Sequence, residues 1–119
     1  MAGSVLIVEN EPDLAEIFAE ILDFEGIDTN VALNGDTALG WLNEHTPDLV
    51  ILDMHMPGIS GLDVFDAIQA DPRLARVPVI AVTADVLLAK EFGARFNEVF
   101  VKPVQIADLL KTCHRFLAD

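Results

Sequence analysis

The sequence predicts an α/β domain in which helices cover both faces of a five-stranded parallel sheet. Short apolar runs that suit buried strands alternate with longer segments whose apolar residues recur at the spacing of a helix face. This alternation occurs five times, without a change of composition or a linker between the units. Because crossover connections between parallel strands are right-handed, we expect a doubly wound sheet with the strand order 2-1-3-4-5.

The first half of the chain contains three expected strands and two expected helices. Residues 5–8 are all apolar, as in a strand buried on both faces, and residues 28–32 form a weaker strand. Residues 49–53 repeat the apolar run and end on an aspartate. Pro12 suits the first turn of the first helix, and Gly26 suits its end. The apolar faces of the two helices consist of Leu14, Ile17, Phe18, Ile21 and Leu22, and of Ala38, Leu39, Trp41 and Leu42.

The second half contains two more strands and three more helices. Residues 60–63, Ser-Gly-Leu-Asp, resemble a capping box that begins the third helix. Residues 78–82 form the fourth strand, and Asp85 is placed to cap the short helix that follows. Residues 99–101 form a short fifth strand. The apolar faces of the three helices consist of Val64, Phe65 and Ile68, of Leu87, Leu88 and Phe92, and of Ile106, Leu109, Leu110, Cys113 and Leu117.

Length and composition limit the classes of function. A chain of 119 residues, 52% of them hydrophobic, is expected to form one domain over residues 1–119. Its net charge of −13 disfavours direct binding to nucleic acid, which needs clustered Lys and Arg, and favours partners with basic surfaces. No apolar run approaches the roughly 20 residues of a membrane span, so no membrane association is expected. The single cysteine, Cys113, excludes an internal disulfide, and we expect a cytoplasmic protein.

Polar side chains follow four of the five expected strands. Glu9 and Asn10 come after the first strand, Asp53 ends the third, Thr83 follows the fourth and Lys102 follows the fifth. In the order 2-1-3-4-5 these four strands are neighbours, and the carboxyl ends of parallel strands lie at the same edge of the sheet. We therefore expect these side chains to converge on one crevice.

The chemical types in this set suit metal-assisted phosphoryl transfer. Two carboxylates, those of Glu9 and Asp53, together with an amide and backbone oxygens form the hard-oxygen site that Mg²⁺ prefers. Asp53 can attack phosphorus as a nucleophile and form an acyl phosphate. The metal and the ammonium of Lys102 would offset charge on the transferring group, and the hydroxyl of Thr83 would donate to a phosphoryl oxygen.

Several short segments, each of them weak alone, form a specific pattern together. They are Val5-Leu6-Ile7-Val8-Glu9, Leu52-Asp53-Met54-His55-Met56-Pro57-Gly58, Gly61, Val82-Thr83-Ala84 and Lys102-Pro103. On these segments, and along nearly all its length, the chain resembles the receiver domain of two-component response regulators. That family has the flavodoxin-like (βα)5 fold, in agreement with the sheet predicted above.

The resemblance implies a phosphoacceptor signalling domain, whose only catalysis is its own phosphorylation and dephosphorylation. It implies that Asp53 accepts a phosphoryl group from a phosphohistidine of a sensor histidine kinase or a phosphotransfer protein. It implies that Glu9, Asn10 and Asp53 hold Mg²⁺, with the backbone carbonyl of His55 as a further ligand. The domain would then be a phosphoprotein that is reset after each signal.

The resemblance also implies how the phosphorylated state is read. Thr83 would be the switch hydroxyl and Lys102 the cation that binds phosphate, with a cis peptide bond before Pro103. Output would pass to a downstream protein target that the sequence does not identify. The surface formed by parts of residues 86–96 and 106–118 commonly makes target or homodimer contacts in the family.

Two positions depart from the family pattern. The family usually has two acidic residues where this chain has Glu9 and Asn10, so we expect weaker Mg²⁺ binding and slower phosphorylation. Glu11 is a candidate substitute for the missing acid. Val99 stands where the family usually has Tyr or Phe, and Phe100 should point to the opposite face of its strand. The aromatic half of the usual switch is therefore expected to be absent.

Three alternative functions compete with this one. A phosphohydrolase of the haloacid dehalogenase type would need a second aspartate where this chain has His55. A flavodoxin-like electron carrier would need a Ser/Thr/Gly-rich phosphate loop after the first strand, and the sequence has none. A degenerate receiver, marked by Asn10 and Val99, would act as a phosphorylation-independent interaction module, and this alternative stays open.

Overall fold

The computed structural model describes residues 3–118 and confirms the predicted architecture. Five parallel strands form one sheet in the order β2-β1-β3-β4-β5. Among the described residues, no helix combines the length and the apolar character needed to cross a bilayer. The strands are β1 (Ser4–Val8), β2 (Asp28–Ala32), β3 (Leu49–Asp53), β4 (Val79–Thr83) and β5 (Glu98–Val101). The helices are α1 (Pro12–Phe24), α2 (Gly35–Glu44), α3 (Gly61–Ala70), α4 (Val86–Phe92) and α5 (Ile106–Leu117), with a 3₁₀ turn at Gly93–Arg95.

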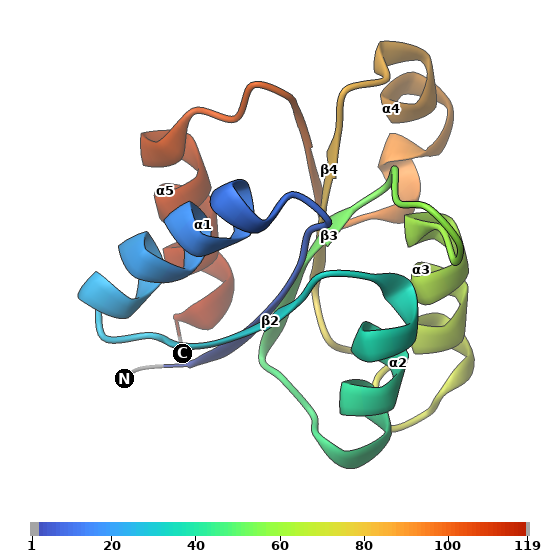
Figure 1. The fold of residues 1–119 in the computed structure, drawn as a ribbon, viewed down its shortest axis with the longest axis horizontal. Coiled ribbons are helices and arrows are strands. Elements are labelled where there is room, and N and C mark those ends of the chain that lie inside the picture. The colour runs from blue at the N-terminus through green and yellow to red at the C-terminus, as the bar shows by residue number, and fades with distance from the viewer. Residues whose placement is uncertain (1–2, 119) are drawn as a thin grey trace.

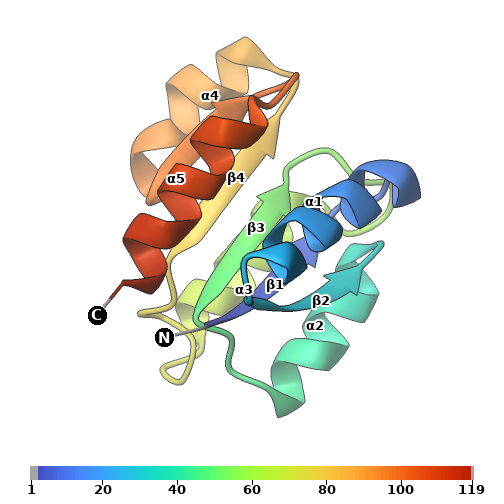
Figure 2. The ribbon, with the colours of Figure 1, turned by 90° about the vertical axis from the view of Figure 1, so that its left-hand side faces the viewer.

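The helices cover the sheet on both faces. Helices α1 and α5 lie on one side of the sheet, and α2, α3 and α4 lie on the other (Figures 1 and 2). Each side has its own apolar core, because alternate residues of a strand point to opposite faces. In β1, for example, Val5 and Ile7 belong to the core under α1 and α5, whereas Leu6 and Val8 belong to the other. This two-sided burial is why Val5–Val8 of β1, Leu49–Leu52 of β3 and Val79–Val82 of β4 are apolar at every position, whereas the edge strand β2 is largely exposed and more polar.

The register of the strands brings the polar strand ends together. Val8 pairs with Leu52 across β1 and β3, so Glu9 and Asp53 follow side by side. Asp53 pairs with Val82 across β3 and β4. Thr83, one residue beyond Val82, is the last residue of β4, and Lys102 directly follows β5. The four side chains therefore lie at the carboxyl edge of the sheet, as predicted.

Two helix caps hold the loops that leave this edge. The capping box at the start of α3 is confirmed: Ser60 Oγ accepts the Asp63 N–H at 3.2 Å, and Asp63 accepts the Ser60 N–H at 3.3 Å. The carboxylate of Asp85 caps α4, accepting the N–H groups of Leu87 at 2.9 Å and Leu88 at 3.1 Å. The β3–α3 and β4–α4 connections are thus tied down next to Asp53 and Thr83.

Candidate functional site

Buried polar side chains are concentrated at the carboxyl edge of the sheet. Glu9, Asp53 and Thr83 are 1%, 2% and 0% exposed, and Thr112 is the only other polar or charged residue buried among residues 3–118. Burying a carboxylate costs free energy unless it is paired with a cation or hydrogen-bonded. Two carboxylates kept at this edge therefore indicate a functional site.

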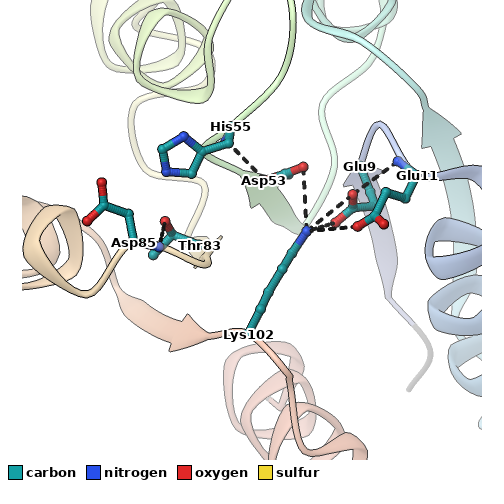
Figure 3. A network of polar contacts seen from close by, with 7 residues as sticks. All are labelled: Glu9, Glu11, Asp53, His55, Thr83, Asp85 and Lys102. Atoms are coloured by element: carbon teal, nitrogen blue, oxygen red, sulfur yellow. Dashed lines mark hydrogen bonds and ion pairs between the residues drawn. The ribbon is translucent and has the colours of Figure 1, made fainter.

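Lys102 supplies the positive charge of this site. Its side chain extends from the end of β5 toward the carboxylates that follow β1 and β3 (Figure 3). The Nζ atom lies 3.2 Å from Glu9 Oε1, 3.3 Å from Glu11 Oε2 and 3.8 Å from Asp53 Oδ2. Three carboxylates thus surround one ammonium, and the predicted proximity of Glu9, Asp53 and Lys102 is confirmed.

The two oxygens of Asp53 have different environments. Oδ1 accepts the backbone N–H of His55 at 3.0 Å, which orients the carboxylate. Oδ2 is buried and has no hydrogen-bond partner among the described residues. The 3.8 Å separation from Lys102 Nζ is an ion pair that is too long for a hydrogen bond. Asp53 therefore keeps a lone pair that an electrophile or a metal ion can use.

The charges of the site shift each other's proton affinity. Burial raises the pKa of Glu9, and the neighbouring charge of Asp53 raises it further, whereas Lys102 and a hydrogen bond from the Glu11 N–H oppose the shift. Burial alone would lower the pKa of Lys102, but the carboxylates of Asp53 and Glu9 outweigh it and raise the pKa. Lys102 is therefore a permanent cation at neutral pH.

The raised pKa of Glu9 predicts how stability depends on pH. Between the ordinary pKa of 4.5 and the raised value, folded Glu9 binds a proton that unfolded Glu9 has released. The contribution of Glu9 to the free energy of unfolding therefore falls as pH rises through this window, by about 1.4 kcal/mol per pH unit. Urea unfolding in EDTA, measured at increasing pH from 4.5 upward, should show this fall in the wild type until the raised pKa is passed, but not in Glu9→Gln. Equal slopes in both proteins would contradict the prediction.

Thr83 lies at the same edge but faces another partner. Its hydroxyl oxygen accepts the backbone N–H of Asp85 at 3.0 Å. This hydroxyl has no hydrogen bond to Asp53 or Lys102 among the described residues, as Figure 3 shows, although the Lys102 N–H donates to the Thr83 backbone carbonyl at 2.8 Å. The structure therefore brings Thr83 to the edge but leaves its hydroxyl on the β4–α4 loop.

Three further features expected from the sequence, at Pro103, at Val99 and Phe100, and at Cys113, are present in the structure. The Lys102–Pro103 peptide bond is cis, as the resemblance implies. Val99 packs with the core on the α2–α3–α4 side and Phe100 with the core on the other, so they point to opposite faces as expected. Cys113 is fully buried, and burial raises the pKa of its thiol to about 12, so it is not a nucleophile at neutral pH.

Sequence reasoning missed two contacts of the site. Glu11, considered only as a substitute ligand, places its carboxylate on Lys102. The backbone N–H of His55 holds Asp53, whereas the His55 side chain is exposed. The spacing of Glu9 and Glu11 was the available signal for the first contact, because two residues in an irregular turn before Pro12 can face the same group. No sequence signal identified the second contact.

The donor atoms of the site suit a hard divalent cation. The buried carboxylates of Glu9 and Asp53 offer the oxygen ligands that Mg²⁺ prefers, and the half-buried Asn10 follows Glu9. Within residues 3–118, no three Asp, Glu, His or Cys side chains are arranged to hold a metal. The predicted ligand set has only two carboxylates, and its other members are an amide and a backbone carbonyl; it stays a prediction.

Fold and site together define a class of protein: a doubly wound α/β domain with a buried aspartate and a lysine at the carboxyl edge of its sheet. The family model described as the response regulator receiver domain matches residues 5–114. The chain belongs to this family, and the resemblance inferred from its sequence is confirmed. Receiver domains are signalling domains that interact with histidine kinases or phosphotransfer proteins.

Individual relatives agree with this assignment. The chain is 34% identical to the polar-differentiation response regulator DivK of Brucella anthropi, with 100% of this chain and 99% of DivK covered. It is 37% identical to the DNA-binding response regulator MtrA of Mycolicibacterium smegmatis over 92% of this chain but only 48% of MtrA. The response regulator TrrA of Thermotoga maritima, solved in complex with Mg²⁺ and BeF, superposes with a TM-score of 0.87 at 32% identity, with 98% of this chain and 100% of TrrA covered.

Proposed function

We propose that this receiver domain is switched by phosphorylation of Asp53. The observation that carries the proposal is the buried Oδ2 atom of Asp53, which has no hydrogen-bond partner among the described residues and faces Lys102. The His55 N–H holds the carboxylate through Oδ1, and the unbonded Oδ2 is thereby fixed in a position that suits nucleophilic attack. The histidine kinases and phosphotransfer proteins that act on receiver domains would supply the phosphoryl group.

Each residue of the site has a proposed role in this transfer. Asp53 Oδ2 forms a bond to phosphorus while the bond from phosphorus to the donor histidine nitrogen breaks, and that nitrogen keeps the electron pair. Lys102 offsets the negative charge of the transferred group, because its ammonium already lies at the site. Thr83 would leave the Asp85 N–H and donate its hydroxyl hydrogen to a phosphoryl oxygen, which couples the β4–α4 loop to phosphorylation.

A magnesium ion is proposed as the cofactor of this site. Glu9, Asn10, Asp53 and the backbone carbonyl of His55 would hold it. When bound, it would supply positive charge that stabilises the transferring phosphoryl group. The TrrA structure shows that a related receiver binds Mg²⁺.

The proposal is tested by incubation with acetyl phosphate and Mg²⁺. We expect the intact mass to increase by one phosphoryl group, with EDTA preventing the increase.

The departures at Asn10 and Val99 favour a degenerate receiver as the second candidate. Absence of any mass increase at saturating acetyl phosphate, together with unchanged amide NMR spectra, would favour that candidate and contradict the proposal.

Asn10→Asp is expected to strengthen Mg²⁺ binding at least tenfold. At ~4 Å and an effective dielectric constant near 20, one added charge pair is worth about 4 kcal/mol as an upper bound, and metal hydration hides part of it. Amide NMR titrations with Mg²⁺ would measure both affinities. Asn43→Asp, which adds the same charge on the exposed side of α2, is the matched control and should change little. Equal Mg²⁺ affinities for Asn10→Asp and the wild type would refute the expectation.

The charge of this chain is distributed unevenly, which bears on its partner. All 7 Lys and Arg residues lie between Arg73 and Arg115, whereas residues 1–72 contain 15 Asp and Glu. That acidic part includes α1, β2 and α2 at one edge of the sheet (Figure 2). We expect the kinase or phosphotransfer partner to present a basic surface to it.

Phosphotransfer from such a partner should slow severalfold between 50 and 300 mM salt, since salt screens the electrostatic attraction that brings the two proteins together. A phosphotransfer rate that does not depend on salt would contradict this expectation.

A second surface is proposed for output. Val86 and Leu87 of α4 and Val101 of β5 are 52%, 72% and 42% exposed, so this surface offers apolar side chains to a partner. On the same α4–β5–α5 surface, Arg115 pairs with Glu98 at 3.1 Å, so charges of both signs are present. Apolar and mixed-charge character suits either a downstream protein or a second copy of this chain.

A further inference from the structure

The ion cluster around Lys102 contains one member that the proposed phosphotransfer does not use. Glu11 directly precedes α1, and its side chain is 64% exposed, whereas the Glu9 and Asp53 side chains are 2% exposed. Its carboxylate nevertheless lies 3.3 Å from Lys102 Nζ. Figure 3 shows Glu11 beside Glu9, with both carboxylates on the ammonium. Glu11 therefore covers Lys102 from the solvent side.

Lys102 lies closer to the two glutamates than to Asp53. Lys102 Nζ is within hydrogen-bonding distance of Glu9 at 3.2 Å and of Glu11 at 3.3 Å, but it is 3.8 Å from Asp53. An ammonium has three donors, so the two glutamates leave Lys102 only one donor for a group on Asp53. Release of one glutamate would give Lys102 a second donor for a phosphoryl group.

Glu11 is the partner whose contact with Lys102 is easier to break. The Glu9 carboxylate is buried and is also held by the Glu11 N–H at 3.1 Å, so releasing it would leave a buried charge with fewer partners. The Glu11 carboxylate is exposed and would be hydrated after release, and exposed ion pairs are weak. Exchange of partners on Lys102 is thus expected to occur at Glu11.

We propose that Glu11 competes with the phosphoryl group for Lys102, as a restraint that lowers phosphoryl affinity in the resting domain. The inference rests on the proposed role of Asp53. Glu11 acts here as a positioning residue, since it would touch Lys102 and not the phosphoryl group. Removing its carboxylate should release Lys102 toward Asp53.

The test is a titration of beryllofluoride with Mg²⁺, followed by amide NMR, on the wild type and three variants. Glu11→Gln removes the charge and weakens the contact. Glu11→Asp keeps the charge but shortens the side chain by one methylene, so it separates contact from charge. Asp13→Asn removes a nearby exposed charge of α1 that makes no contact with Lys102 among the described residues. Urea unfolding checks that all four proteins are folded alike.

We expect Glu11→Gln and Glu11→Asp to bind beryllofluoride about two- to fivefold more tightly than the wild type, with Asp13→Asn unchanged. The difference should shrink in high salt, because an exposed ion pair is screened. Without ligand, the ¹⁵N signal of the Lys102 ammonium should shift in both Glu11 variants and not in Asp13→Asn.

Specific outcomes would overturn the inference. Weaker binding by Glu11→Gln would show that Glu11 assists the site. If Glu11→Asp binds beryllofluoride with the same affinity as the wild type, the charge of residue 11 acts without contact to Lys102. If no protein binds beryllofluoride, the proposed function fails together with the inference. If all bind it with equal affinity, only the inference fails.

Discussion

Replacing Gly61 with alanine is expected to destabilise the fold by about 3 kcal/mol and to slow phosphorylation of Asp53 strongly. Gly61 is the first residue of α3 and lies against the end of β3. A Cβ atom at this position would be 2.4 Å from the carbonyl oxygen of Asp53 and 2.6 Å from the Cα atom of Met54. Both contacts are with backbone, which cannot move aside as a flexible side chain can. The start of α3 must therefore shift, and the segment that carries Asp53 must shift with it.

Gly40→Ala is the matched control for this prediction. Gly40 lies within α2, and an added Cβ atom would have no neighbour within 4 Å. Alanine there should stabilise the protein by about 0.5–1 kcal/mol, because glycine is unfavourable in a helix interior. Urea unfolding of both variants measures the two effects. A Gly61→Ala protein as stable as the wild type would show that the approach of α3 to β3 does not position Asp53.

Replacing Asp53 with asparagine is expected to abolish phosphorylation while leaving stability equal to that of the wild type or about 1 kcal/mol higher. The amide cannot act as the nucleophile, although its oxygen can still accept the His55 N–H. The substitution also removes a buried charge close to Glu9, whose pKa the Asp53 carboxylate helps to raise. Intact mass after incubation with acetyl phosphate and urea unfolding measure the two effects.

Asp36→Asn, an equal change of charge at an exposed position in the first turn of α2, is the control and should be phosphorylated at the wild-type rate. Undiminished phosphorylation of Asp53→Asn would exclude Asp53 as the acceptor. A large loss of stability in this variant would indicate a structural role for the carboxylate, in addition to any chemical one.

Much of the fold could be predicted because local patterns and global topology agree. The run Val5–Val8 is apolar at every position, which only a strand covered on both faces requires, and the structure divides these residues between two cores. The capping residues Ser60 and Asp85 marked the starts of α3 and α4 correctly. With the strand order known, Glu9, Asp53, Thr83 and Lys102 had to lie at one edge of the sheet.

The details of the site could not be predicted in the same way, because they depend on side-chain torsions and on backbone groups. Lys102 has a long, flexible side chain. Its ammonium lies closer to Glu9 and Glu11 than to Asp53, and no sequence motif specifies these distances. The Thr83 hydroxyl bonds to the Asp85 N–H and not to Asp53, because the turn after β4 places that N–H within hydrogen-bonding distance.

The most direct test of the account is to locate the phosphoryl group chemically. Borohydride reduces an aspartyl phosphate to homoserine and releases phosphate, so the acceptor is marked permanently. After incubation with acetyl phosphate and Mg²⁺, peptide mapping should find homoserine at position 53 and nowhere else. A phosphorylated protein whose reduced product lies at another residue, or that yields no homoserine, would contradict the assignment of Asp53 as the phosphoacceptor.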